Sequence, residues 1–119
     1  MNQRPSILPV TTLLALDTQN ETQQRLAACR EQIDSLDQSI VQLIQERARI
    51  VEKIRKIKRE ALLPVFVAAR EQQVIEKAQE LAKGGPLPAD AVARIYQKLV
   101  QEMRNWEAKL DEQPANQVW

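Results

Sequence analysis

Three charged residues of the chain fall where the helical spacing of apolar residues calls for a hydrophobic side chain: Arg47, Glu71 and Glu107. Apolar residues flank them at steps of three or four: Leu43 and Ile50, Val67 and Val74, and Met103 and Leu110. Burying an unpaired charge costs several kcal/mol, so each needs a compensating partner. Arg47 could form an internal ion pair with Glu71 or Glu107, extend its charge to solvent, or bind a charged ligand.

Arg47 and Lys58 define a cationic stripe on one predicted helix. They are eleven residues apart, close to three full turns at about 100° per residue, so their side chains point the same way. Val51 and Ile54 lie between them. Such a stripe suits a small anionic ligand. The other basic residues nearby are expected to form mostly a solvated face, offset by acids: Arg49, Lys53, Arg55, Lys56 and Arg59.

Arg30 cannot join this stripe on the same straight helix. It precedes Arg47 by seventeen residues, which leaves a residual rotation of about 260°. An antiparallel neighbouring chain could bring its own Arg30 to the stripe. The alternative is a surface arginine beside Asp34, one turn further on.

The residues that are absent exclude several classes of site. The chain has no His, so Ser/His and Cys/His pairs and His-containing metal sites are excluded. The lone Cys29 can form no internal disulfide, and no Gly-rich phosphate loop is present. A net charge of +1 argues against nucleic acid or an anionic membrane as partner. We therefore expect no metal and no cofactor, and no membrane span.

The elements that position these residues are predicted to be helices only. The first runs from about residue 21 to 59 and ends before Pro64, and the second from about 68 to 83, stopped by Gly84 and Gly85. The third begins near Pro88 and runs to about residue 110. The expected fold is all-α, with one long and two shorter helices per chain.

The length of the first helix predicts a dimer. About 38 residues make a helix of about 57 Å, whereas a compact chain of this size has a radius of gyration of about 13 to 14 Å. The two shorter helices cannot cover its whole apolar stripe, so a second copy is expected to do so. The predicted assembly is an intertwined homodimeric helical bundle.

Three regions are predicted along the chain: a loosely ordered leader over residues 1–21, the helical domain over 22–111, and a flexible tail over 112–119. The leader run ILPVTTLLAL faintly resembles a secretory signal, but it is short, contains Pro9 and precedes no clear cleavage site. We expect a cytoplasmic protein and leave export, and removal of the leader, open.

Three runs together resemble one protein family: CREQIDSLDQSIVQLIQERARIVEKIRKIKRE, LPVFVAAREQQVI and GPLPADAVARIYQKLVQEMRNWE. They are similar to the all-helical, type II class of chorismate mutases over about residues 24 to 110. The specific elements are an Arg before I-D-x-L-D, an E-R pair followed by spaced Ile and Lys, and an R-E pair shortly after a Pro. The resemblance implies an intertwined dimer with two equal active sites.

The resemblance also implies roles for individual cations. Arg30 would enter the site from the other chain, and Arg47 and Arg70 would hold the two carboxylates of the substrate. Lys58 would bond the ether oxygen and a carboxylate.

For the acids, the resemblance implies that Glu71 accepts from the ring hydroxyl and that Glu107 donates to the ether oxygen. Donation requires a protonated Glu107 with a raised pKa, which its apolar neighbours would favour. Two positions depart from the family pattern, since Val67 stands where an Asp is common and Met103 where a small hydroxyl residue is common. Both departures remove polar contacts to the substrate.

The expected function is thus the rearrangement of chorismate to prephenate, by electrostatic clamping and orientation without covalent catalysis. The alternatives on the same fold are an isochorismate pyruvate lyase and a 4-amino-4-deoxychorismate mutase. An alternative of another class is a non-catalytic helical dimerisation module whose charged core residues form internal ion pairs.

Overall fold

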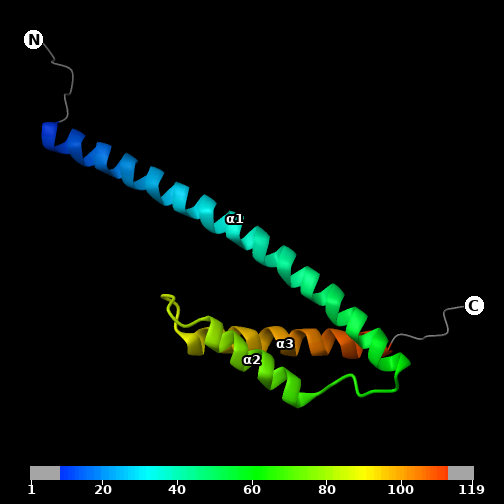
Figure 1. Cartoon of the computed structure of the whole chain (residues 1–119). Coiled ribbons are helices and arrows are strands. Elements are labelled where there is room, and N and C mark those ends of the chain that lie inside the picture. Colours follow the sequence, from blue (N-terminus) through cyan, green and yellow to red (C-terminus); the bar gives the residue numbers. More distant parts are fainter. Residues whose placement is uncertain (1–8, 113–119) are drawn as a thin grey trace, which may run out of the picture. The chain divides into compact units, whose positions relative to one another are not determined.

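The computed structural model describes residues 9–112, and within them the chain is helical throughout apart from two short links. Its helices are α1 (Val10–Glu60), α2 (Ala68–Leu81) and α3 (Ala89–Glu112), which Figure 1 shows in chain order. No strand occurs in these residues, which confirms the predicted all-α class with one long and two shorter helices. The chain divides into an N-terminal unit, residues 1–44, and a C-terminal unit, residues 45–119.

α1 begins earlier than the sequence pattern indicated. The prediction placed its start near residue 21, but residues 10–21 are helical rather than loosely ordered, and the amide of Leu13 donates to the carbonyl of Pro9 at 3.0 Å. The run after Pro9 contains no Gly or Pro, and Leu, Ala and Gln within it favour a helix. Residues 1–8 and the predicted tail beyond Glu112 lie outside the described part.

The N-terminal unit is the first part of α1, and it carries a stripe of exposed apolar side chains. No residue of α1 is buried. Large apolar side chains along the stripe are 42% to 62% exposed: Leu26, Ile33, Leu36, Ile40 and Leu43. In residues 9–112, no helix has the length and apolar character needed to span a membrane.

The C-terminal unit is built on α2 and α3, which pack side by side (Figure 1). Its buried apolar residues come from these two helices: Ala78, Ala93, Val100 and Met103. The turn between the helices contains Gly84 at φ +92°, a conformation that glycine adopts without strain. α3 then begins after Pro88, whose carbonyl accepts from the amides of Ala91 and Val92.

The end of α1 determines the course of the link to α2. The amide of Leu63 donates to the carbonyl of Lys58 at 2.7 Å, and that of Leu62 donates to Arg59 at 3.1 Å. These two bonds, with Leu62 at φ +57°, form a Schellman-type helix end. Pro64 follows, so the link cannot continue the helix and turns back along the C-terminal unit.

Candidate active site

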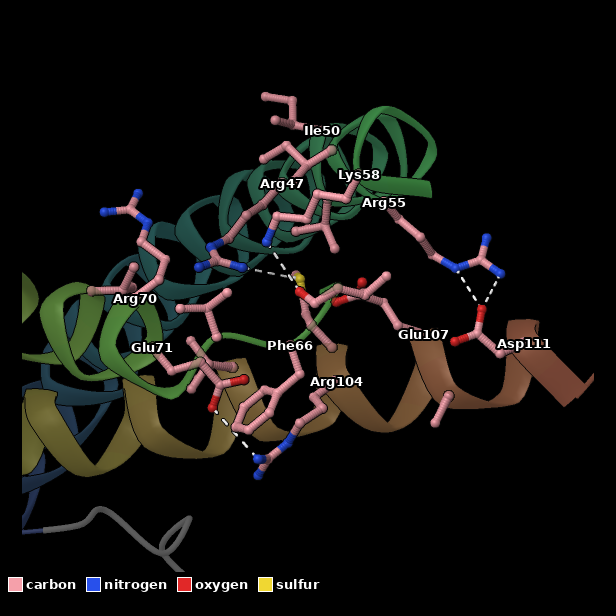
Figure 2. A pocket seen from close by; sticks show the side chains of 18 residues that line it. Arg47, Ile50, Arg55, Lys58, Phe66, Arg70, Glu71, Arg104, Glu107 and Asp111 are labelled. Atoms are coloured by element: carbon pink, nitrogen blue, oxygen red, sulfur yellow. Dashed lines mark hydrogen bonds and ion pairs between the residues drawn. The ribbon is translucent and has the colours of Figure 1, made fainter. Parts of the chain in front are cut away.

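A cavity of about 390 Å³ lies in the C-terminal unit, between the end of α1, the link, α2 and α3 (Figure 2). Its size is within the range of about 300 to 1,000 Å³ typical of small-molecule sites. Seven of the eight predicted site residues line it: Arg47, Lys58, Val67, Arg70, Glu71, Met103 and Glu107. The fold thus gathers, around one cavity, residues that are up to sixty positions apart in the sequence.

Arg47 is half-buried, and its partner is not an acid. Its Nη1 donates to the Sδ of Met103 at 3.1 Å (Figure 2). In residues 9–112, no ion pair joins Arg47 to Glu71 or Glu107, so the internal pair considered from the sequence is not formed. A thioether is a weak acceptor. The guanidinium therefore faces the cavity with most of its charge uncompensated.

Lys58 connects the end of α1 to the wall of the cavity. Its Nζ donates to the carbonyl of Val65 at 3.0 Å, while its own carbonyl accepts from Leu63. Lysine carries three N–H donors, so one bond to a carbonyl leaves two for another acceptor. Figure 2 shows Arg47 and Lys58 reaching from the same helix toward the side of α3 that carries Glu107.

Glu107 is half-buried, and its pKa is raised above the ordinary value of 4.5, chiefly because burial disfavours the ionised carboxylate. The positive charges of Arg55 and Lys58 oppose this shift, while the negative charges of Asp111 and Glu71 add to it. The raised pKa has the direction expected from the apolar setting. Glu107 therefore keeps its proton, and can donate a hydrogen bond, to a higher pH than an exposed glutamate.

Glu71 lies on the first turn of α2 and faces Arg104 of α3, with 3.8 Å between Oε1 and Nη1. The guanidinium of Arg104 also lies over the ring of Phe66, 4.7 Å from its centre, a cation–π arrangement. Sequence reasoning missed Arg104. The signal that could have found it was its position four residues after Val100, on the flank of the apolar face.

Arg55 corrects a prediction, because it was expected on the solvated face. Its side chain is only 11% exposed, lines the cavity and pairs with Asp111. The signal was present in the spacing, since Arg55 follows Val51 by four residues and precedes Lys58 by three. Asp111 was also missed, and it lies on the last described turn of α3.

The remaining predicted residues lie at the margin or elsewhere. Val67 is the N-cap residue of α2 and makes no side-chain cap. Arg70 is exposed, and its Nη1 donates to Gln73 Oε1 at 2.8 Å. Arg30 is exposed on α1 in the N-terminal unit. Its predicted entry into the site from a second chain, like the roles of all these residues, stays a prediction.

The chain is similar in sequence to a longer bifunctional enzyme and to a shorter chorismate mutase. The chain is 34% identical over 90 residues to a bifunctional chorismate mutase/prephenate dehydratase of Aquifex aeolicus, a match that covers 73% of this chain and 25% of that protein. The chain thus spans about a quarter of the length of this bifunctional relative. It is also 25% identical to a chorismate mutase of Methanocaldococcus jannaschii. That match covers 78% of this chain and 94% of the Methanocaldococcus protein.

Solved structures of similar fold include a chorismate mutase of Thermus thermophilus. Its form II matches with a TM-score of 0.66 at 24% identity, covering 75% of this chain and 97% of that one. Residues 29–108 match the family described as chorismate mutase type II, and they include every residue of the cavity discussed above except Asp111. The chain belongs to the type II chorismate mutase family.

Proposed function

We propose that the chain catalyses the rearrangement of chorismate to prephenate. The observation that carries this proposal is an apolar cavity in which two of the lining cations, Arg47 and Lys58, have a thioether and a backbone carbonyl as acceptors instead of acids. Uncompensated cations in an apolar setting favour a small anion. The reaction suits such a site because one carbon–oxygen bond breaks while one carbon–carbon bond forms within a single molecule. No nucleophile, general base, metal or cofactor takes part.

The cations fold the substrate into its reactive shape. Arg47 and Arg70 hold the two carboxylates, and Lys58 donates to a carboxylate and to the ether oxygen, where negative charge grows in the transition state. An acceleration of about a millionfold requires about 8 kcal/mol. Charge-assisted hydrogen bonds contribute about 1.5 to 3 kcal/mol each, so three or four of them, together with orientation, are sufficient.

Glu107 is the second donor to the ether oxygen in this proposal. Its raised pKa supports the role, because only the protonated acid can donate and an ionised carboxylate would repel the developing charge. Glu71 accepts from the ring hydroxyl. Val67 and Met103 supply apolar walls where polar contacts are common in the family, so the hydroxyl has fewer partners here.

The active unit in this proposal is a homodimer in the cytoplasm, with Arg30 of each chain entering the site of the other. The exposed apolar stripe of α1 supports the dimer, since such a stripe is stable in water only when a second surface covers it. Arg30 lies on the same helix as that stripe, so the pairing that covers the stripe can also carry Arg30 to a partner.

The test incubates the protein separately with chorismate, isochorismate and 4-amino-4-deoxychorismate and identifies each product. The loss of chorismate absorbance is followed across pH. Prephenate as the product, with a rate that falls as pH rises, would support the proposal. Isochorismate converted to salicylate and pyruvate would identify a lyase, and turnover of 4-amino-4-deoxychorismate alone would identify the amino-substrate mutase. A folded protein that turns over none of the three substrates would contradict the enzymatic proposal and favour a dimerisation module.

A further inference from the structure

Two pairs of opposite charges face each other beside the cavity, and they are not matched one to one. α3 carries two carboxylates one turn apart, Glu107 and Asp111, and α1 carries two guanidiniums one turn apart, Arg55 and Arg59. Both guanidiniums bind Asp111. The Nε of Arg55 donates to Asp111 Oδ1 at 2.9 Å, and Nη2 atoms of Arg55 and Arg59 contact the same oxygen.

Arg55 also has Glu107 within its electrostatic reach. Both side chains line the same cavity, and Arg55 is the positive charge with the largest influence on the carboxyl of Glu107. In residues 9–112, Glu107 nevertheless has no ion pair. Figure 2 shows the guanidinium of Arg55 turned to Asp111, beyond Glu107.

We propose that Asp111 is a positioning residue for the rearrangement: it holds the Arg55 guanidinium at the edge of the cavity and so keeps Arg55 from pairing with Glu107. This inference rests on the proposed function, in which Glu107 must carry a proton to donate to the ether oxygen. An Arg55–Glu107 ion pair would stabilise the carboxylate and remove the donor. Asp111 thereby keeps Glu107 in its donating form by acting through Arg55.

The other charges around Glu107 do not provide this control. From α1 it faces Lys58, which is bound to the link carbonyl of Val65, and from α2 it faces Glu71, which pairs with Arg104. The link contributes only apolar side chains to the cavity. The remaining charged groups that line the cavity, Arg47 and Arg70, donate to Met103 and Gln73, and neither is among the charges that shift the pKa of Glu107. Arg55 is thus the cation whose position decides whether Glu107 is paired.

The test uses two substitutions that should act in opposite directions. Asp111→Asn frees Arg55 to pair with Glu107, so the pKa of Glu107 should fall and the activity midpoint should move to lower pH. Above the midpoint, activity should drop about tenfold for each pH unit of that shift. Arg55→Gln removes the competing cation, so the midpoint should move to higher pH. In the Arg55→Gln background, Asp111→Asn should shift the midpoint much less than it does alone.

Glu107 should also be titrated directly, by carbon NMR of its labelled carboxyl group in the protein without substrate. The same opposite shifts are expected there. This readout separates the two proposals, because it does not depend on turnover of chorismate. Glu102→Gln is the matched control, since it removes another acid of α3 that pairs with a cation, Lys98, outside the cavity. Glu102→Gln should leave the pKa of Glu107 unchanged.

Shifts of the same sign for Asp111→Asn and Arg55→Gln, or an unchanged titration of Glu107 in both, would overturn the inference. So would an equally large effect of Asp111→Asn in the Arg55→Gln background, because Asp111 would then act by its own charge. If the expected NMR shifts are seen but chorismate is not turned over, the positioning of Arg55 by Asp111 would stand, and the proposed reaction would be wrong. Both variants change contacts at the rim of the cavity, and their helical circular dichroism should match the parent.

Discussion

At the scale of single residues, the protonation of Glu107 determines how the proposed activity depends on pH. A carboxylic acid donates a hydrogen bond only while protonated, and burial raises the pKa of Glu107. Activity should therefore be full on the acid side of that pKa and fall as pH rises through it. Glu107→Gln places a donor that does not titrate, so it should flatten the profile of kcat against pH.

The control for this substitution is Glu112→Gln, an exposed acid on the same helix that does not line the cavity. It should preserve the shape of the profile. If Glu107→Gln kept the pH dependence of the parent protein, another group would be titrating, and Glu107 would not be the donor to the ether oxygen.

Arg47→Ala tests the cationic stripe. Loss of one charge-assisted bond costs about 1.5 to 3 kcal/mol, which corresponds to a drop of about 10-fold to 150-fold in kcat/KM. Stability should change little, because the acceptor that loses its donor is only the thioether of Met103. Arg49→Ala, two residues away and exposed, should keep its activity. Unfolding of Arg47→Ala would instead indicate that Arg47 supports the core.

Sequence alone could identify the site residues that interrupt an apolar face. Arg47, Glu71 and Glu107 did so, and all three line the cavity. Arg55 and Arg104 also lie at helical steps from residues of the cavity, but each is on the flank of its helix, where a charged side chain is ordinary, so the spacing alone does not single them out. Whether such a side chain turns to solvent or to the cavity depends on its partner across the fold, and spacing within one helix does not contain that partner.

At the scale of elements, the end of α1 holds the link that carries three residues of the cavity wall. Leu62 has φ +57° and is 91% exposed, so its side chain gains almost nothing from packing. A left-handed conformation costs a non-glycine residue about 1 to 2 kcal/mol. Leu62→Gly removes this cost but adds chain entropy to the unfolded state, so the free energy of unfolding should rise by up to about 1 kcal/mol.

Urea unfolding of the parent and Leu62→Gly measures this change, with Leu62→Ala as the control. Alanine shortens the exposed side chain but keeps the strain, so it should leave the midpoint nearly where it was. Equal midpoints for all three proteins would mean that the helix end is not held in the left-handed conformation in solution.

The helix ends that are marked by proline or glycine could be predicted from the sequence. Pro64 and the Gly84–Gly85 pair limited α1 and α2 to within a few residues, and Pro88 marked the start of α3. The start of α1 could not be predicted in this way, because residues 17–24, DTQNETQQ, interrupt the apolar periodicity. Periodicity reports burial, whereas a solvated helix requires only residues without a helix-breaking preference. The helix therefore continues through a stretch that carries no core signal.

At the scale of the whole molecule, the apolar stripe of α1 should be an interface in solution. Ile40 lies on the stripe and is 51% exposed within one chain. Ile40→Glu would place a charge at the interface, at a cost of several kcal/mol per site. Sedimentation at micromolar concentration should show a dimer for the parent and for Gln38→Glu, on another face, but a monomer for Ile40→Glu. A monomeric parent would contradict the dimer.

Mixing two variants of reduced activity tests whether the site is shared between chains. If Arg30 of one chain completes the site that holds Arg47 of the other, a dimer of one Arg30→Ala and one Arg47→Ala chain contains one intact site and one doubly altered site. Random exchange makes about half of the dimers mixed, so about one quarter of the parent activity should return.

Each variant alone should stay near its low level, because every site of its homodimer lacks one arginine. Both chains must be unfolded and refolded together for full exchange, with the parent treated in the same way as the reference. Activity equal to the average of the two variants would place Arg30 and Arg47 in the same chain's site, or Arg30 in no site at all.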